Sequence, residues 1–457
     1  MITAGIFKAN DIRGAVPQQW DEHGAAAIGA AFVELAGLEG KQFVMGRDMR
    51  TTGWEMSRAF AAGAVSRGAI VLDTGLAATD QLWFASGSLD LPGVQFTASH
   101  NPPGDNGVKF CRAGAAPVED GFLARLRERA TELDGSVDPA GFGEGLQQVD
   151  TLADYVQHLH HLVPLEGLRH LKVVVDAGNG MAGHTVTAAL GGADIDMVGL
   201  FLDLDGTFPN HQPNPLEPQN LVDAQAAVRE HGADLALVFD GDADRCFIID
   251  ERGEVVSPSA ITALIARAEL EREPGATIVV NTITSRTVAD VVAEQGGTTV
   301  VSRVGHTFVK ALMAQHDAIF GGEHSAHYYF RDFWGADTGM LAALHVIRIL
   351  GSTDQPLSEV MKDYERYAAS GEINSQVADA GEVMEKVEAA FIGRGDADHL
   401  DGLTVRGVDP RGQLWWFNLR PSNTEPYLRL NVEAIDPEVM VAVRDDVLDL
   451  VHEGNPR

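Results

Sequence analysis

Short apolar runs recur in the N-terminal part of the chain, separated by stretches long enough to form helices. The runs are Gln42–Met45, Ala69–Leu72 and Val94–Phe96, and a helix-length segment from Glu55 to Arg67 lies between the first two. Strands that alternate with helices in this way are typical of a sheet covered by helices. The pattern therefore predicts an α/β unit at the N-terminus.

The same alternation continues beyond this unit. Leu171–Asp176 and Leu235–Phe239 predict strands of a second unit, with a helical run ending near Leu190 between them. Thr277–Val280 and Thr299–Val301 predict strands of a third, with a helix from Ser285 to Glu294 between them. Each of the two stretches thus predicts one further α/β unit.

The domain boundaries follow from changes in this pattern. The stretch from Asp134 to Asp150 is rich in loop-forming residues, and beyond Gln376 the alternation gives way to two helices and strands of a smaller α+β unit. A chain of 457 residues leaves room for about three or four domains. We predict domains at residues 1–150, 151–253, 254–366 and 367–457.

Charge narrows the range of partners. The formal net charge is −32, which argues against binding to nucleic acid or to an anionic membrane. An anionic substrate would have to be captured by a local cluster of basic residues. Met1–Gly5 begins no signal sequence, and no run of about 18 apolar residues occurs, so we expect a cytoplasmic protein. Cys111 and Cys246 have no metal-binding or redox spacing, which fits a reducing compartment.

Thr97–Pro102 follows the apolar run ending at Phe96 and contains a serine in a tight turn. The pattern indicates a buried strand that stops abruptly and exposes the Ser99 hydroxyl at its tip. An ordinary Asx-type turn around Asn101 is one alternative. A Ser-His-Asp hydrolase is another, but neighbouring Ser99 and His100 should diverge, and no Gly-x-Ser-x-Gly elbow is present. We interpret Ser99 as a candidate nucleophile.

Three carboxylates lie between two apolar strands. Asp240, Asp242 and Asp244 would repel one another unless a cation joins them, and ligands that are all oxygen select Mg²⁺ or Ca²⁺. An EF-hand is excluded because its glycine position holds Arg245 and both flanks are predicted strands. A solvated acidic turn is the structural alternative. The pattern predicts a magnesium site.

Gly178–Gly183 matches the Gly-x-Gly-x-x-Gly pattern that binds dinucleotides. It follows a predicted strand, but this unit does not stand at the head of a nucleotide-binding fold, and the motif by itself is weak. Close packing between strand and helix accounts for the glycines without a ligand.

Two polar clusters and a final loop complete the candidate chemistry. Arg303–Thr307 and Gly321–His327 hold three histidines, but their spacing is no zinc motif and Ala318–Phe320 is predicted as a strand. We interpret them as hydrogen-bonding groups for a polyhydroxylated ligand. The last loop, with Arg420 and Arg429 around a tight turn, predicts an anion-binding concavity, although a simple hairpin turn is the alternative.

Five motifs, in order along the whole chain, resemble the α-D-phosphohexomutases, and within them the bacterial phosphomannomutase/phosphoglucomutase group. They are Asn10–Gly14, the phosphoserine loop Thr97–Pro102, the Mg²⁺ loop Asp240–Arg245, the sugar loop Gly322–His327 and the phosphate loop Arg420–Arg429. The resemblance implies three related α/β domains with mixed sheets and a C-terminal α+β domain around a central cleft.

The resemblance also implies a role for each matching residue. A phosphorylated Ser99 would exchange its phosphoryl group with the substrate, Mg²⁺ would be bound by Asp240, Asp242, Asp244 and a phosphoserine oxygen, and the C-terminal loop would hold the other phosphate. Lys109 should have a pKa lowered by neighbouring cations, which would suit acid-base catalysis. The implied catalytic residues are Ser99, Lys109, Arg13, Arg245, His306 and His327, and the implied substrate-binding residues are Glu323, Ser325, His327, Arg420, Ser422, Asn423, Thr424 and Arg429.

Three positions depart from the family's usual residues. Asn10 stands where tyrosine is usual, Asp80 where a proline commonly follows Thr79, and Ala326 where glycine is usual. The last substitution could narrow the sugar site.

The implied function is interconversion of hexose 1-phosphate and hexose 6-phosphate, of mannose, glucose or both, through a hexose 1,6-bisphosphate that also acts as activator. Phosphoglucosamine mutase and a metal-dependent sugar phosphatase are the alternatives. We expect small sugar phosphates as partners and a monomer or homodimer.

Overall fold

The computed structural model describes residues 2–141, 145–422 and 427–453. The chain forms two compact units: residues 2–256 with 325–359, and residues 257–324 with 360–453. No helix among the described residues combines the length and apolar character needed to cross a bilayer.

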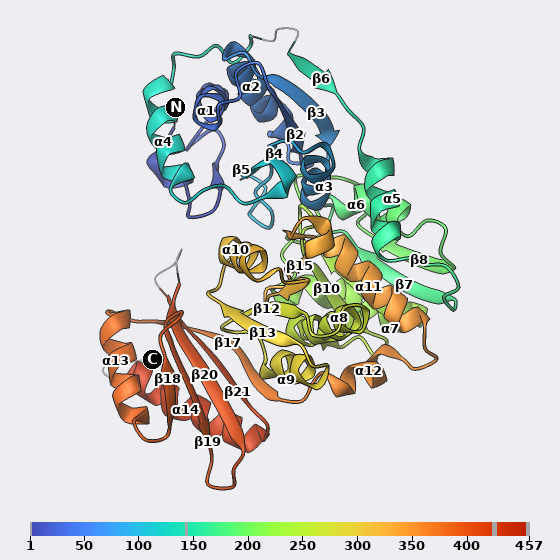
Figure 1. Cartoon of the computed structure of the whole chain (residues 1–457), viewed down its shortest axis with the longest axis vertical. Coiled ribbons are helices and arrows are strands. Elements are labelled where there is room, and N and C mark those ends of the chain that lie inside the picture. Colours follow the sequence, from blue (N-terminus) through green and yellow to red (C-terminus); the bar gives the residue numbers. More distant parts are fainter. Residues whose placement is uncertain (1, 142–144, 423–426, 454–457) are drawn as a thin grey trace. The chain divides into compact units, whose positions relative to one another are not determined.

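The first unit begins with a six-stranded sheet in the order β1-β5-β4-β2-β3-β6 (Figure 1). β2, β3, β4 and β6 are parallel, and β5 runs antiparallel to both β4 and β1, so the sheet is mixed. The elements are β1 (Ile12–Ala15), α1 (Glu22–Ala36), β2 (Gln42–Arg47), α2 (Gly53–Ser66), β3 (Ile70–Leu76), α3 (Thr79–Leu89), β4 (Gly93–Phe96), β5 (Asp105–Cys111), α4 (Phe122–Leu133) and β6 (Leu146–Gln148).

This sheet packs against α1, α2 and α4 through an aromatic core. Phe32 of α1 contacts Phe43 on β2 and Phe60 on α2, with ring centroids 5.3 and 5.9 Å apart. α1 and α2 approach closely at Gly29, where an added Cβ would lie 2.1 Å from the Phe60 carbonyl oxygen. The core holds the strands so that the loops leaving β2 and β4 start from fixed points.

A second five-stranded sheet of the same unit has the order β11-β10-β9-β7-β8. β7, β8 and β9 are parallel, and β10 returns antiparallel to β9. Its elements are α5 (Leu152–Leu162), β7 (Leu171–Asp176), α6 (Ala182–Ala189), β8 (Ile195–Leu200), α7 (Val222–His231), β9 (Leu235–Phe239), β10 (Cys246–Asp250) and β11 (Val255–Val256). The unit is completed by β15 (Tyr328–Phe330), β16 (Ala336–Asp337), α11 (Gly339–Gly351) and α12 (Leu357–Val360).

The glycines of Gly178–Gly183 serve close packing. An added Cβ at Gly180 would lie 2.7 Å from the Gly241 carbonyl oxygen, and one at Gly183 would lie 2.0 Å from that of Leu202. The Met181 N–H also donates to the Gly241 oxygen at 2.9 Å. The glycines therefore allow this loop to support the aspartate loop.

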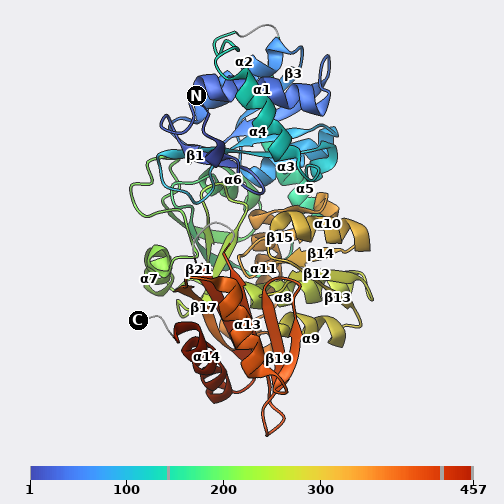
Figure 2. The ribbon, with the colours of Figure 1, turned by 90° about the vertical axis from the view of Figure 1, so that its left-hand side faces the viewer.

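The second unit contains parallel strands β13, β12 and β14 and a separate C-terminal sheet in the order β17-β21-β20-β19-β18. α13 and α14 pack on one face of that sheet (Figure 2), where Phe391 of α13 contacts Trp415 and Phe417. The elements are α8 (Pro258–Arg272), β12 (Thr277–Asn281), α9 (Arg286–Glu294), β13 (Thr298–Ser302), α10 (His306–His316), β14 (Phe320–Gly322), β17 (Ala368–Gln376), α13 (Ala380–Phe391), β18 (Gly395–Asp398), β19 (Leu403–Val408), β20 (Leu414–Pro421), β21 (Tyr427–Ala434) and α14 (Pro437–His452).

Most sequence-predicted strands are confirmed within one or two residues, with two exceptions. β3 continues to Leu76, four residues beyond the expected run Ala69–Leu72. The strand expected at Ala318–Phe320 is β14, which begins at Phe320 and includes both following glycines. An added Cβ on Gly322 would lie 2.4 Å from Thr262 Cγ2 of α8, so only a glycine fits that close contact.

Candidate active site

Ser99 lies where the chain leaves β4, in a left-handed backbone conformation with φ of +50°. Its N–H donates to Thr97 Oγ1 at 2.8 Å, which closes the turn. The residue is only 3% exposed, so the expectation of a solvent-exposed hydroxyl is wrong. The hydroxyl instead donates to Asp240 Oδ2 at 2.8 Å. The candidate nucleophile therefore faces the candidate metal ligands.

The Arg50 guanidinium holds the serine loop by its backbone. One terminal nitrogen donates to the carbonyls of Pro102 and Asp105 at 2.7 and 2.8 Å, and the other donates to those of Ser99 and Asn101 at 2.8 and 2.7 Å. Four carbonyls bound by one planar group set the path of the loop. Sequence reasoning missed this role of Arg50, and the only signal for it was the pair of arginines at the end of β2.

Arg13 adds a second anchor to the same loop. It donates from Nη1 to Asn101 Oδ1 at 3.1 Å and pairs through Nε with Asp11 at 2.8 Å. β1 and β5 are neighbouring strands in which Arg13 is opposite Gly107, two residues from Lys109. The antiparallel return of β5 also places Lys109 opposite Gln95 on β4, as expected from the sequence.

His100 is closer to Ser99 than the sequence suggested. Its Nδ1 lies 3.3 Å from the Ser99 hydroxyl, so the expectation that the two side chains diverge is wrong. The same nitrogen accepts from Arg245 Nη2 at 2.5 Å. Burial, with help from the charges of Arg245 and Arg13, lowers the pKa of His100 well below its usual value. His100 is therefore a neutral acceptor.

Asp240, Asp242 and Asp244 lie on the connection between β9 and β10, and oxygen atoms of the three carboxylates lie within 4.8 Å of one another. Arg245 donates to Asp240 at 2.8 Å, and Lys109 Nζ lies 2.7 Å from Asp242 and 2.5 Å from Asp244. Two further oxygens, Asp242 Oδ1 and Asp244 Oδ1, are buried and have no hydrogen-bond partner among the described residues. Buried, unpaired carboxylate oxygens in an all-oxygen set fit a hard divalent cation.

Burial and neighbouring charges shift the pKa values of Asp240 and Asp242 in opposite directions. Burial raises the pKa of Asp240 to about 7, against the influence of Arg245. Burial also acts to raise the pKa of Asp242, but the Lys109 ammonium outweighs it and holds that pKa below its usual range. Burial acts to lower the pKa of Lys109, yet Asp242 and Asp244 outweigh it, and the pKa is raised. The expectation of a lowered Lys109 pKa is wrong, because carboxylates face this ammonium more closely than cations do.

The aspartate loop is tied to α3 by Thr79, a contact that sequence reasoning missed. Thr79 Oγ1 donates to Asp242 Oδ2 at 2.6 Å, and its N–H donates to the Asp242 carbonyl at 2.9 Å. The next residue, Asp80, is fully buried and accepts from Tyr155 and Thr338 hydroxyls at 2.8 and 2.7 Å. Asp80, one of the departures from the family's usual residues, thus forms a hydrogen-bonded network next to the residue that holds the aspartate loop.

Asp80 gives a testable pH dependence of stability. Burial raises its pKa to about 7, against hydrogen bonds from Thr338 and Tyr155 that favour the ionised form. A carboxyl whose pKa is higher in the folded chain stabilises most below the unfolded value near 3.8 and loses that contribution as pH rises through about 7. Asp80→Asn removes this titration. The stability of the metal-free variant relative to wild type, followed by the midpoint of thermal unfolding, should therefore rise from pH 4.5 to 7.5, by up to about 3 kcal/mol in free energy.

The control for this measurement is Asp194→Asn, which changes an exposed carboxylate of the same unit. A difference between Asp80→Asn and wild type that stays constant across that pH range would contradict the assignment.

Other candidate residues of the first unit lie near the aspartates. His327 Nε2 is 3.8 Å from Asp244 Oδ1, and its Nδ1 is 2.9 Å from the Ser325 hydroxyl. His327, Asp244 and Asp337 form a further group with potential ligand atoms within 4.8 Å of one another. Ala326 is buried with φ of +65°, a conformation that explains why glycine suits this position.

The second unit holds the remaining candidates. Glu323 is 2% exposed, and its Oε2 accepts from Asn281 Nδ2 at 3.0 Å and from the Gly305 N–H at 3.3 Å. His306 is the first residue of α10, directly after that glycine. The structure therefore brings the two sugar-site clusters of the sequence together at Glu323.

Arg420 and Arg429 face each other across β20 and β21, as expected. Glu372 lies between them and accepts from both at 2.9 Å, a partner that the sequence did not reveal. Burial lowers the pKa of Arg420 although Glu372 opposes the shift. Ser422 follows β20, whereas Asn423 and Thr424 lie outside the described residues.

Comparison with known proteins covers the chain almost completely. Family models described as phosphoglucomutase/phosphomannomutase alpha/beta/alpha domains I, II and III match residues 4–135, 153–253 and 257–367, and the corresponding C-terminal domain matches residues 372–450. A phosphomannomutase of Escherichia coli K12 is 40% identical over 98% of this chain and 99% of its own. Phosphohexose mutases of Xanthomonas campestris are 36% identical over 99% of this chain and 100% of their own. The crystal structure of a phosphoglucomutase/phosphomannomutase family protein from Burkholderia thailandensis has a TM-score of 0.89, with 31% identity and coverage of 100% and 99% of the two chains.

Proposed function

Because this chain belongs to the phosphoglucomutase/phosphomannomutase family, it is a hexose-phosphate mutase, and we propose that Ser99 carries the phosphoryl group it transfers. The observation that carries this proposal is the hydrogen bond from Ser99 Oγ to Asp240, in a site where three carboxylates meet the cationic side chains of Lys109 and Arg245. Such a site suits phosphoryl transfer, in which catalysis is mainly positioning and neutralisation of charge.

In the proposed reaction, phosphorylated Ser99 meets the free hydroxyl of a hexose monophosphate. The bond between phosphorus and the serine oxygen breaks and a bond to the sugar oxygen forms. The sugar hydroxyl proton passes to a base, the serine oxygen takes up a proton, and a hexose 1,6-bisphosphate results. The reverse step at the other end of the sugar returns a phosphoryl group to Ser99. Arg245, whose Nη2 lies 3.3 Å from Ser99 Oγ, is placed to stabilise the charge that develops there.

Asp240, Asp242 and Asp244 are the residues that would bind Mg²⁺, together with an oxygen of the phosphorylated Ser99. When bound, the ion would neutralise charge on the transferring group. The buried oxygens without hydrogen-bond partners on Asp242 and Asp244 support this assignment. Lys109, which faces these two carboxylates, and Arg13, which holds the serine loop, complete the proposed cationic environment.

The remaining candidates are proposed to bind the sugar and its second phosphate. Glu323 and Ser325 would anchor sugar hydroxyls, and His306 and His327 are candidate acids or bases. The non-reacting phosphate would be held by Arg420, Ser422, Asn423, Thr424 and Arg429. The proximity of Arg420 and Arg429 supports that role, with Glu372 as the carboxylate that an incoming phosphate would compete with.

A coupled assay for conversion of 1-phosphate to 6-phosphate tests this proposal. It should be run on mannose, glucose and glucosamine phosphates with hexose 1,6-bisphosphate as activator. Conversion of mannose and glucose phosphates is the expected result. Release of inorganic phosphate without isomerisation would indicate a phosphatase, and turnover of glucosamine phosphate alone would indicate a phosphoglucosamine mutase.

Glu323 provides a prediction about specificity. Mannose and glucose phosphates differ at the 2-hydroxyl, so an anchor to the 3- and 4-hydroxyls should accept both, with kcat/KM values within about two decades. Glu323→Ala should lower kcat/KM for both substrates by a similar factor, about 10- to 150-fold for the loss of a charge-assisted hydrogen bond. Steady-state kinetics with both 1-phosphates checks this.

The matched variant for this experiment is Glu433→Gln, which changes a buried glutamate of the same unit that is bonded to Trp416 and Arg286 instead. If Glu323→Ala abolished turnover of one epimer and spared the other, the anchor model would be wrong, and the buried methyl of Ala326 would become the candidate specificity determinant.

A further inference from the structure

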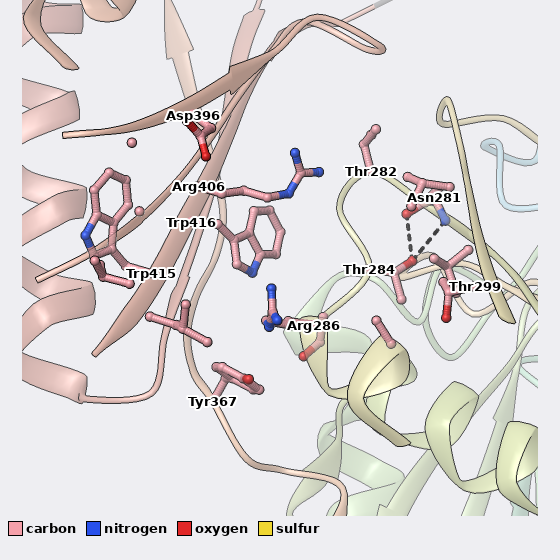
Figure 3. Close-up of a pocket in the computed structure, with 18 of the residues that line it drawn as sticks. Asn281, Thr282, Thr284, Arg286, Thr299, Tyr367, Asp396, Arg406, Trp415 and Trp416 are labelled. Carbon is pink, nitrogen blue, oxygen red and sulfur yellow. Dashed lines mark hydrogen bonds between the residues drawn. The ribbon is translucent and has the colours of Figure 1, made fainter. Parts of the chain in front are cut away.

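A cavity of about 540 Å³ lies within the second unit, and its lining includes no residue of the serine or aspartate loop (Figure 3). One wall is the end of β12 and the start of α9, and the other is the face of the C-terminal sheet opposite α13 and α14. Because strand side chains alternate between faces, Trp415 and Phe417 of β20 enter the core beneath α13, while Trp416 faces the cavity. Its volume is in the range of small-molecule sites, about 300 to 1,000 Å³.

Basic residues outnumber acidic ones in the lining of the cavity, unlike in the chain as a whole. Acidic residues outnumber basic ones by 66 to 34 in the whole chain, but the charged residues that line this cavity are three arginines, Arg286, Arg394 and Arg406, and one acid, Asp396. Arg394 is bound to Asp446 at 2.8 Å. Arg286 and Arg406 are held only loosely by acids, at 3.5 and 3.4 Å, with side chains 43% and 42% exposed. These two guanidinium groups favour an anionic ligand.

The rest of the lining is largely apolar, which a small inorganic anion would leave uncovered. Val280, Val301, Val408 and Leu414 form apolar walls beside Trp416. Figure 3 shows Arg406 and Arg286 next to the Trp416 side chain, one on each side in this view. A ligand that covers these walls needs a flat apolar part as well as a negative group, because indole and guanidinium planes both stack on aromatic rings.

One buried polar atom also lacks a partner. Thr282 lines the cavity and is only 6% exposed, and its hydroxyl makes no hydrogen bond among the described residues. An unsatisfied buried hydroxyl is costly, so a ligand that supplies a donor or acceptor would remove that cost.

We propose that this cavity is a second ligand site that binds a nucleoside diphosphate, with the base against Trp416 and the apolar walls and the phosphates on Arg286 and Arg406. A sugar phosphate matches the cations but leaves the apolar walls uncovered. An apolar metabolite covers the walls but brings no negative group to Arg286 and Arg406, whose acidic partners lie 3.5 and 3.4 Å away.

A hydrogen bond connects the cavity lining to a residue of the proposed sugar site. Asn281 lines the cavity and donates to Glu323 at 3.0 Å, and Arg286 N–H and Trp416 Nε1 both donate to Glu433, at 3.0 and 2.7 Å. A ligand that shifts Asn281 therefore acts on the candidate sugar-binding carboxylate through one hydrogen bond. This coupling rests on the function proposed above, whereas binding itself does not.

Isothermal titration calorimetry of the full-length protein with GDP tests the site. Wild type should bind with a Kd of about 1 mM or tighter, and inorganic diphosphate should bind at least about tenfold more weakly because it lacks the stacking base. Arg286→Gln and Arg406→Gln should each weaken GDP binding about tenfold. Arg411→Gln is the matched control, since Arg411 is an exposed arginine, 56% accessible, at the turn between β19 and β20 and outside the cavity lining. Mutase turnover without nucleotide should be the same for all three variants.

Three results would overturn the proposal. The first is no binding at millimolar GDP, and the second is equal affinity for inorganic diphosphate and GDP. The third is GDP binding that is abolished by excess hexose 1,6-bisphosphate but is unchanged in Arg406→Gln. The last would place the nucleotide in the substrate site. A wild-type KM for hexose phosphate that does not respond to saturating GDP would refute the coupling through Asn281, and normal mutase turnover in the same samples would show that the proposed function still holds.

Discussion

Replacing Ser99 with alanine should abolish mutase turnover, with a fall in kcat of about 10⁴-fold or more, as expected when a covalent nucleophile is removed. The reason is structural as well as chemical. Ser99 Oγ donates to Asp240 at 2.8 Å and lies 3.3 Å from Arg245, and among the described residues of its loop it is the hydroxyl bonded to both groups. Intact-mass measurement after incubation with hexose 1,6-bisphosphate should show one added phosphate on wild type and none on Ser99→Ala.

Ser57→Ala is the matched control. Ser57 is also a serine 3% exposed in the same unit, but its hydroxyl bonds only to the Trp54 carbonyl, at 3.2 Å, within α2. This variant should keep both the added phosphate and turnover. A Ser99→Ala protein that still accepts phosphate, or that turns over normally, would remove Ser99 from the mechanism.

Replacing Asp242 with asparagine should weaken Mg²⁺ binding by at least the roughly 10- to 100-fold that losing a hydrogen-bonding partner of a metal ligand costs. The substitution removes one of three mutually repelling carboxylates and, with it, a contact of Lys109 at 2.7 Å. Calorimetric titration with Mg²⁺ measures the affinity directly. Mg²⁺ should also raise the unfolding midpoint of wild type, by linkage, and raise that of the variant much less.

The control here is again Asp194→Asn, whose carboxylate is 72% exposed and paired with His170. It should bind Mg²⁺ as wild type does. Superimposable Mg²⁺ titrations of wild type and Asp242→Asn would refute the metal assignment, even if the variant were less active for another reason.

The serine loop shows how far sequence reasoning reached. The abrupt end of the apolar run at Phe96 was enough to predict a strand and a turn, because a buried strand must stop where polar side chains and prolines begin. Burial of the hydroxyl was missed, because it comes from residues about 140 positions later in the chain, on the β9–β10 connection. The contact between Ser99 and His100 was missed for a different reason: the left-handed backbone at Ser99 turns adjacent side chains toward a common partner, Arg245.

For Lys109, the position could be predicted from the sequence but the direction of its pKa shift could not. Its place one hairpin from Ser99 could be predicted, because β4 and β5 are joined by a short connection. The sign of its pKa shift could not, because nearby cations in the sequence are not the nearest charges in space. Asp242 and Asp244 come from a different sheet and lie within 2.7 Å of its ammonium.

The sequence by itself determined the three successive α/β patterns, since these depend on local periodicity. Residue chemistry at short spacing was enough to predict a metal site at the aspartate loop and Ser99 as the candidate nucleophile. Only the tertiary structure decided which groups share a site. Arg50 binds four carbonyls of the serine loop, Thr79 binds Asp242, and Glu372 separates Arg420 from Arg429, each across tens to hundreds of residues. Such contacts depend on which strands become neighbours in a sheet, and the packing of the whole core sets that order.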